Sequence, residues 1–279
     1  MSELVLGAVA YDAKVVTIWE GFKAYFNAHG LAFDFVLYSN YERQVAAHLR
    51  GDIDVAWNSP LAWVDTRRAA PDRAKAIAMR DTDRDLTSVV LVRADGAAAS
   101  AGRIETVADL RRVAVGALDS PQATLIPLLA LAEAGVGRGV EAVCHDVLVG
   151  KHGDHIGGER DAVKALLAGT VDAACVIDGN RLAFAREGLF APGQLRVLLQ
   201  TGPYDHCNFT VLAETPATDV LRELLLAMSY DDPAVRPLLD MEGLTRWLPG
   251  RTSGYALLER AVGETEPGRG VPAPFTRAR

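Results

Sequence analysis

The sequence predicts an α/β protein built from two units, and three observations support this. A chain of 279 residues is longer than one small domain requires. Short apolar runs alternate with stretches of helical periodicity, the order that is typical of parallel strands joined by helices. The small and polar segment 94–103 (ADGAAASAGR) separates two such series. We therefore predict one lobe from residues 1–92 plus 200–279 and a second lobe, inserted in the first, from residues 93–199.

The first series opens with a continuous apolar run at 4–10, as expected for a strand that is covered on both faces. Apolar residues then recur at helical spacing over 14–29. Asn40 and Ser59 each stand before a further helix as capping residues, and Pro60 suits a first helical turn. Strands are predicted at 4–10, 33–38, 53–57, 76–79 and 86–92, and helices at 14–29, from Asn40 to about Arg50, and from Ser59 onward.

The second series repeats this order after the polar segment. Thr106 caps a short helix, and Ser120-Pro121 opens an apolar helix that runs to about Ala134. Strands are predicted at 113–117, 143–149, 171–177 and 195–200, and a helix at 158–167. The chain then returns to the first lobe with a strand at 208–212 and closes with helices at 216–228 and 233–241. Two long crossings between the series predict a hinged clamp, whose ligand lies outside the carboxyl ends of the strands.

Composition and charge exclude several classes of function. The net charge of −7 argues against a nucleic-acid or membrane-surface partner. No apolar run approaches the roughly 20 residues that a membrane span needs. The three cysteines, at 144, 175 and 207, have no CxxC spacing, which predicts free thiols rather than a zinc or redox site. We expect no cofactor and no metal.

The chain begins with Met1-Ser2-Glu3 directly before the first predicted strand. This start has no basic region followed by an apolar leader and a small-residue cleavage site. The sequence therefore predicts a cytoplasmic protein, or a periplasmic one if a leader has been removed.

Several segments resemble the phosphonate/phosphite-type solute-binding proteins of ABC transporters. The stretch 51–64 (GDIDVAWNSPLAWV) is similar to a Gly…Asp…Trp…Pro segment of that family, and Thr87–Asp95 is similar to its hinge strand. The segments 106–111 (TVADLR) and 160–174, which contains RDAV and AGTVDAA, resemble two further family motifs. The similarity spans about residues 4–215.

This resemblance implies the two-lobed type 2 periplasmic-binding-protein fold, with a hinged cleft between the lobes. It also implies a small anionic ligand, phosphonate-like, phosphate-like or a carboxylate, and an ABC permease as partner. The Ser/Thr-rich turn with which the family holds its ligand corresponds here to 119–124 (DSPQAT).

Candidate ligand-binding residues follow strands, where the backbone N–H groups of the next helix attract anions. Asn58 and Ser59 hold this place in the first lobe, and Ser120 and Gln122 hold it in the second. Tyr11 and Tyr38 follow strands at the same sheet edge and can wall a ligand. Each of these residues can instead serve capping or packing alone.

The stretch 150–160 (GKHGDHIGGER) carries the densest chemistry, and three interpretations stay open. Lys151, His152, His155 and Arg160 offer cationic donors for an anion. His152, His155 and Glu159 have a weak metal-ligand spacing. The third interpretation is a solvated surface loop.

One further pair of residues could take part in catalysis. His206 and Cys207 are adjacent, and because neighbours on an extended chain point to opposite faces, we expect no direct contact between them.

The leading function is a small-anion binding protein. The alternative is a cytoplasmic enzyme on the same fold, a decarboxylase or other acid/base catalyst for a small aromatic or keto acid, with His152, His155 and Glu159 as catalytic groups. A cytoplasmic ligand sensor is a third possibility.

Overall fold

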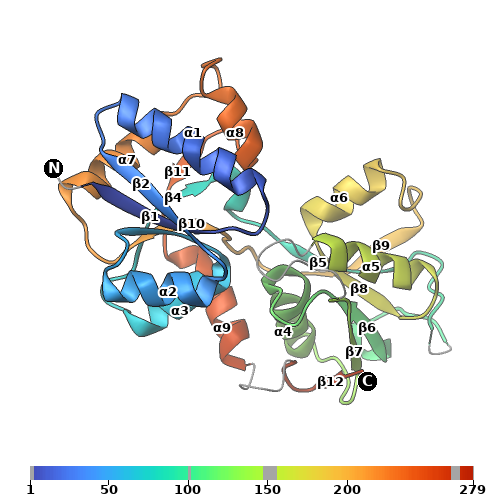
Figure 1. The fold of residues 1–279 in the computed structure, drawn as a ribbon. Helices are drawn as coiled ribbons and strands as arrows, with labels where there is room; N and C mark the ends of the chain where they lie inside the picture. The colour runs from blue at the N-terminus through green and yellow to red at the C-terminus, as the bar shows by residue number, and fades with distance from the viewer. Residues whose placement is uncertain (1–2, 100–101, 147–155, 265–270, 279) are drawn as a thin grey trace. The chain divides into compact units, whose positions relative to one another are not determined.

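The computed structural model describes residues 3–99, 102–146, 156–264 and 271–278, which form two compact α/β units (Figure 1). Among these residues, the first unit takes everything up to Asp85 and the segment Asp205–Tyr255. The second takes Leu86 to Tyr204 and everything from Ala256. The predicted α/β class is confirmed.

The first unit is a six-stranded sheet in the order β11-β4-β10-β3-β1-β2. Strand β1 pairs in parallel with β2 and β3, whereas β10 runs antiparallel to both β3 and β4. The carboxyl ends of β1 to β4 therefore meet the amino end of β10 at one edge. Its elements are β1 Leu4–Val9, α1 Lys14–Ala28, β2 Phe33–Tyr38, α2 Tyr41–Arg50, β3 Val55–Asn58, α3 Pro60–Ala69, β4 Lys75–Arg80, η1 Asp81–Asp83, β10 Asn208–Val211, α7 Pro216–Ala227, α8 Arg236–Glu242, β11 Trp247–Pro249 and η4 Ser253–Tyr255.

Aromatic packing fixes the central strands of this sheet. The rings of Trp57 and Phe209, on neighbouring strands, lie 4.8 Å apart, and Trp247 on β11 lies 5.2 Å from Phe209. Trp19 of α1 meets the Phe209 ring edge-on at 6.0 Å. Such pairs contribute about 0.5–1.5 kcal/mol each beyond their buried area. Helices α1, α7 and α8 cover this face and α2 and α3 cover the other, so the strand ends at the edge are held by a packed core (Figure 1).

The second unit is also a six-stranded sheet, in the order β12-β7-β6-β8-β5-β9. Strands β6, β7 and β8 are parallel, and β5 runs antiparallel to β8 and β9. Its elements are β5 Ser88–Arg93, η2 Val107–Asp109, β6 Arg112–Val115, η3 Pro121–Leu125, α4 Ile126–Glu133, β7 Glu141–Cys144, α5 Ile156–Leu167, β8 Ala173–Ile177, α6 Asp178–Arg186, β9 Leu195–Gln200, α9 Ala256–Glu264 and β12 Thr276–Arg277. The η3 turn is π-helical.

The division of the chain differs from the expected one at both crossings. Strand β5 belongs to the second unit because it pairs with β8 and β9, although we expected residues up to 92 in the first lobe. The chain returns to the first unit at Asp205 rather than at residue 200, and α9 packs on α4 in the second unit. The sequence indicates where a strand lies in the chain but not which sheet its backbone pairs into.

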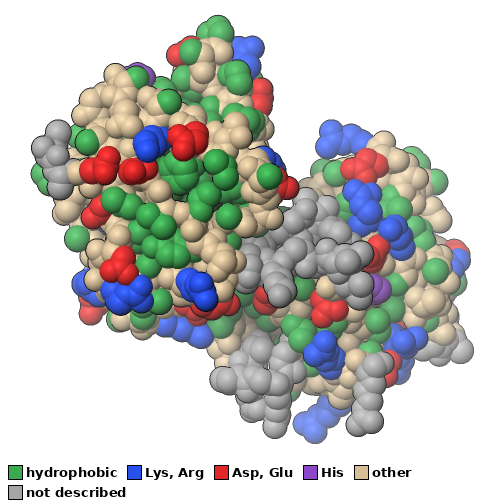
Figure 2. Space-filling view, in the orientation of Figure 1, with side chains coloured by type: hydrophobic (Ala, Val, Ile, Leu, Met, Phe, Trp, Pro, Cys, Tyr) green, Lys and Arg blue, Asp and Glu red, His purple; other side chains and the backbone are tan. Residues whose placement is uncertain are grey.

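Charged side chains of both signs are spread over the visible face of the molecule. In the face that Figure 2 shows, acidic and basic groups alternate over both units and form no large basic patch. Among the described residues, no helix combines the length and the apolar character needed to cross a membrane.

Candidate functional site

The carboxyl edge of the first sheet gathers polar side chains from five strands. Helices α1, α2 and α3 all begin there, because each follows a strand that ends at this edge. The first N–H groups of a helix have no partner within it and carry a partial positive charge. Asn40 and Ser59 cap α2 and α3, accepting hydrogen bonds from Arg43 N at 2.9 Å and Ala62 N at 3.3 Å. The predicted caps are confirmed.

Arg80, at the end of β4, is held by two buried carboxylates. Its guanidinium donates two hydrogen bonds to Asp83, of which the Nη2–Oδ1 bond is 3.0 Å. Its Nη1 donates to the Glu242 carbonyl at 2.9 Å and to Glu242 Oε1 at 3.3 Å. The guanidinium also lies 5.3 Å from the centre of the Trp57 ring. Arg80 is therefore occupied by the protein and serves to position Asp83.

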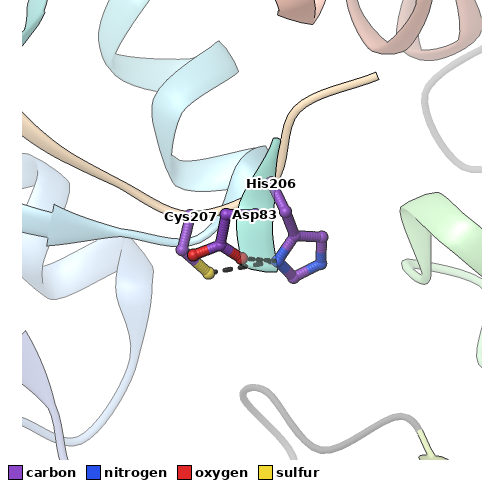
Figure 3. A group of neighbouring side chains, drawn as sticks. All are labelled: Asp83, His206 and Cys207. Atoms are coloured by element: carbon purple, nitrogen blue, oxygen red, sulfur yellow. Dashed lines mark hydrogen bonds and ion pairs between the residues drawn. The ribbon is translucent and has the colours of Figure 1, made fainter. Parts of the chain in front are cut away.

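His206 and Cys207 meet Asp83 immediately before β10 (Figure 3). The His206 Nδ1 lies 3.2 Å from Cys207 Sγ and 3.4 Å from Asp83 Oδ1. The expectation that neighbouring His206 and Cys207 make no contact is wrong. Regular pairing begins only at Asn208, so the alternation of a strand does not govern these two side chains.

The backbone around the trio is fixed as well. His206 N donates to the Asp83 carbonyl at 2.8 Å, and the His206 carbonyl accepts from the Tyr255 hydroxyl at 2.9 Å. Beneath it runs a buried chain of hydrogen bonds through side chains on α2, β3, β10 and η4: Gln44, Asn58, Thr210, Asn208 and Tyr255.

Burial and charge set the protonation of this site. Burial disfavours the charged forms of both Asp83 and His206. The Arg80 and His206 cations outweigh it and lower the pKa of Asp83 to about 2. The Cys207 sulfur and the Asp83 carboxylate likewise outweigh burial and raise the pKa of His206 to about 10. Burial raises the pKa of Glu242 to about 7, against the pull of Arg80. His206 is therefore an imidazolium at neutral pH.

Tyr11 and Tyr41 border this cluster. Burial, with smaller contributions from Glu242 and Cys207, raises the pKa of Tyr11 to about 12 against the opposing effect of Arg80. Burial also raises the pKa of Tyr41 well above its usual value, with further contributions from Cys207 and Tyr11. Tyr11 remains 43% exposed, so it offers a ring to solvent.

Two other predicted residues of the first unit lie elsewhere. The Tyr38 ring packs over the β1 backbone, with its Cε2 3.1 Å from the place of a Cβ on Gly7. Asn58 is fully buried, where its amide donates to Thr210 Oγ1 at 2.8 Å and accepts from Gln44 Nε2 at 2.9 Å. Asn58 therefore supports the edge from within, whereas Tyr38, the last residue of β2, is partly exposed. The role of both residues in binding stays a prediction.

The predicted residues of the second unit occupy a comparable strand end. Ser120 follows β6, is fully buried and accepts a hydrogen bond from Ala123 N at 3.2 Å. The Gln122 carbonyl accepts from the Ser88 hydroxyl at 2.6 Å. Among the described residues, Gln122 Oε1 is a buried acceptor without a hydrogen-bond partner. Their role in binding stays a prediction.

Of the candidates at 151–160, Lys151, His152 and His155 lie outside the described residues. Arg160 is described, and its guanidinium bonds Glu187 at 2.6 Å and stacks on Phe184 at 4.5 Å. Glu159 is fully buried, and its Oε2 accepts from Ile177 N at 2.9 Å and Asn180 Nδ2 at 3.0 Å. These contacts give Glu159 and Arg160 places in the packing of α5.

The sequence reading missed Arg80, Asp83, Tyr41 and Glu242. Buried charged residues are rare unless paired, but burial of Asp83 and Glu242 cannot be read from one sequence. The available signal was weaker: Arg80 ends a predicted strand, and Tyr41 follows the Asn40 cap at the edge already singled out.

A model of the family described as "ABC transporter, phosphonate, periplasmic substrate-binding protein" matches residues 8–255. The chain belongs to this family. The resemblance inferred from the motifs and the type 2 fold are confirmed, and the family is a periplasmic one. Nothing in the match supports the enzyme alternative.

Several solved structures share the fold of this family member. PhnD1 from Prochlorococcus marinus, in complex with methylphosphonate, is 18% identical, with a TM-score of 0.62 over 92% of this chain and 96% of that one. XAC2383 from Xanthomonas citri, bound to ATP, is 17% identical, with a TM-score of 0.68 over 95% and 100%. The periplasmic aliphatic sulphonate binding protein SsuA from Escherichia coli is 16% identical, with a TM-score of 0.50 over 94% and 86%. No curated protein matches the chain.

Proposed function

We propose that this chain is the solute receptor of an ABC importer and that it binds a small anion through the strand-end edge of its first unit. Family membership over residues 8–255 gives the class of function. The relatives bound to methylphosphonate and to ATP suggest the ligand class, a small molecule with phosphoryl or phosphonyl oxygens. The partner that this role requires is an ABC permease, and its place is the periplasm.

The observation that carries the anion assignment is the His206 imidazolium. Its Nδ1 side is turned to Asp83 and Cys207, and its other ring nitrogen lies on the side away from them (Figure 3). A protonated imidazole has two N–H donors, so the outer one is available to an anion. The Asp83 carboxylate behind the ring keeps the proton in place, as a charge-assisted pair does.

The helices supply a second attraction for an anion at this edge. The positive ends of the α2 and α3 dipoles lie beside the ends of β2 and β3, and their caps leave further first-turn N–H groups unsatisfied within the helix. Tyr11 adds an exposed ring with a hydroxyl that stays protonated at neutral pH and can donate. Ser120 and Gln122 of the second unit are proposed as further contacts, and the predicted hinge closure stays a prediction.

The test is a thermal-shift and calorimetric screen of the full chain with methylphosphonate, phosphate, an alkanesulfonate, sulfate, ATP and benzoate, in EDTA. A ligand that binds only the folded state raises the melting temperature by mass action. We expect at least one phosphonate or phosphate compound to bind. His206→Gln should then weaken it about 10- to 100-fold, the loss of one charge-assisted hydrogen bond.

The matched control is His29→Gln, because His29 is exposed at the end of α1 and bonds only the Tyr25 carbonyl in the described structure. It should bind as the wild type does. Ser120→Leu and Gln122→Leu test the second unit in the same assay. If no anion of the panel binds, or if His206→Gln binds as tightly as His29→Gln, the proposal is refuted.

A further inference from the structure

Three different ligand types converge at the end of β4 and the start of β10. The carboxylate of Asp83, the imidazole of His206 and the thiol of Cys207 each present one atom, and these atoms all lie within 4.8 Å of one another. The Nδ1 of His206 is central, at 3.2 Å from the sulfur and 3.4 Å from the Asp83 oxygen (Figure 3). A single N–H on Nδ1 can serve only one of these two acceptors well.

The two separations from His206 Nδ1 are close to those in the ligand shell of a metal ion: 3.4 Å to Asp83 Oδ1 and 3.2 Å to Cys207 Sγ. Zinc binds cysteine sulfur at about 2.3 Å, and histidine nitrogen and carboxylate oxygen at about 2.0–2.2 Å, so tetrahedral ligand atoms lie roughly 3.3–3.6 Å apart. Three protein ligands with one open position are the composition of an accessible zinc site. We infer that Asp83, His206 and Cys207 form a binding site for a zinc-like divalent transition metal, with Oδ1, Nδ1 and Sγ as its ligands. On binding, the metal displaces the proton that His206 carries on Nδ1.

The charges around the site support a divalent ion. A coordinating thiol is deprotonated by the metal, which gives one negative charge at Cys207. Asp83 and Glu242, which are 2% and 7% exposed, can each supply another. The three negative charges of Cys207, Asp83 and Glu242 balance the two positive charges of a divalent ion and the single positive charge of Arg80. The buried set is then neutral, which avoids the cost of an unpaired buried charge.

The surroundings orient the ligands before any metal arrives. Arg80 donates to both oxygens of Asp83, and a carboxylate oxygen has a second lone pair for a metal. The hydrogen bond from His206 N to the Asp83 carbonyl ties the two ligand-bearing segments together at 2.8 Å. Outer contacts of this kind hold the ligands in place, and losing one typically lowers metal affinity about 10- to 100-fold.

The site is open to solvent on one side. The His206 side chain is 22% exposed, whereas that of Asp83 is 3% exposed. A metal therefore has an entry path past the imidazole and an open coordination position for water or for an anion. This inference does not rest on the proposed anion function, because metal binding is measured in the absence of any anionic ligand.

The experiment uses the full chain, freed of metal with EDTA, desalted and kept reduced. Titration with Co²⁺ should produce a near-ultraviolet thiolate-to-cobalt charge-transfer band that saturates at one equivalent. Zn²⁺ should abolish the band by competition. Cys207→Ser should lose the band. Calorimetry should show that its Zn²⁺ affinity is at least about 100-fold weaker, because changes to outer contacts alone cost 10- to 100-fold.

Cys144→Ser is the matched control and should keep the band, because Cys144 belongs to the other unit and lies outside the trio. His206→Gln tests the second ligand, with circular dichroism to establish that each variant is folded. Histidines such as His152 and His155 carry no sulfur and cannot produce this band. Absence of the band in the wild type, or Zn²⁺ affinity unchanged in Cys207→Ser, overturns the inference, whatever the anion screen shows.

Discussion

Replacing Arg80 with methionine should destabilise the first unit more than the loss of any surface charge. Methionine keeps much of the aliphatic contact over Trp57 but removes the guanidinium, which lies 5.3 Å from that ring. Glu242 is then left buried without its cation, and Asp83 keeps only His206 as a cationic partner. Water cannot replace the lost partner at positions that are so little exposed.

The size of the effect follows from the contacts that are lost. Arg80 donates twice to Asp83, once to the Glu242 carbonyl and once to Glu242 Oε1. Removing one partner of a buried ion pair costs about 3–5 kcal/mol, chiefly because the other charge stays buried. With a urea m value of about 2 kcal/mol per molar, the midpoint should fall by about 1.5–2.5 M.

Tryptophan fluorescence can report this unit alone. All four tryptophans of the chain, Trp19, Trp57, Trp63 and Trp247, lie in the first unit. Urea unfolding followed by selective tryptophan excitation therefore measures its stability even if the second unit unfolds separately. EDTA in the buffer keeps the protein free of metal.

Two companion variants make the result decisive. Arg50→Met removes an exposed partner of Asp52, with side chains 64% and 52% exposed, and should cost less than about 1 kcal/mol. Adding Asp83→Asn to Arg80→Met removes a buried carboxylate that has lost its principal cation, and should recover about 1 kcal/mol or more. The reasoning fails if Arg80→Met costs no more than Arg50→Met, or if the double variant is no more stable than the single one.

The remaining predictions use the same fluorescence assay. Burial, with a smaller contribution from Arg73, lowers the pKa of His48 from 6.5 to about 4 and outweighs the opposing effect of Asp54. Between pH 6.5 and pH 4, His48 is protonated in the unfolded chain but not in the folded one. The free energy of unfolding should therefore be highest above pH 6.5 and fall by up to about 3 kcal/mol toward pH 4. His48→Leu should lose less stability between pH 7 and pH 4.5, and equal losses would contradict the assignment. Ser59→Ala removes the α3 cap and should cost about 1 kcal/mol, with Ser59→Thr close to wild type; an alanine variant as stable as the threonine variant would speak against a capping role.

Local signals predicted the elements and their caps well. The Asn40 and Ser59 caps depend only on a short side chain and the N–H groups of the following turn. Apolar runs and helical spacing likewise depend on near neighbours in the chain. Because parallel strands send their carboxyl ends to one edge, the sequence also predicted the edge at which Tyr11 and Ser59 lie.

Partners that are distant in the chain were beyond the reach of these signals. Arg80 contacts Glu242, and Asp83 contacts His206, only because β4, β10 and α8 are brought together by the sheet and its core. The polar chain through Asn58 likewise requires Gln44 and Thr210 from other elements. Nothing local distinguishes the buried Asp83 from the partly exposed Asp81 two residues before it.

The sequence by itself determined the α/β class, the order of strands and helices, and the family, since these follow from periodicity, capping chemistry and short motifs. The tertiary structure decided which sheet β5 joins, how Tyr38 packs, and that His206 and Cys207 meet over Asp83. Sheet pairing and side-chain direction outside regular strands depend on the free energy of long-range contacts, which a run of neighbouring residues does not contain. The chemistry of the edge therefore comes from residues that only the folded first unit brings within 4.8 Å of one another.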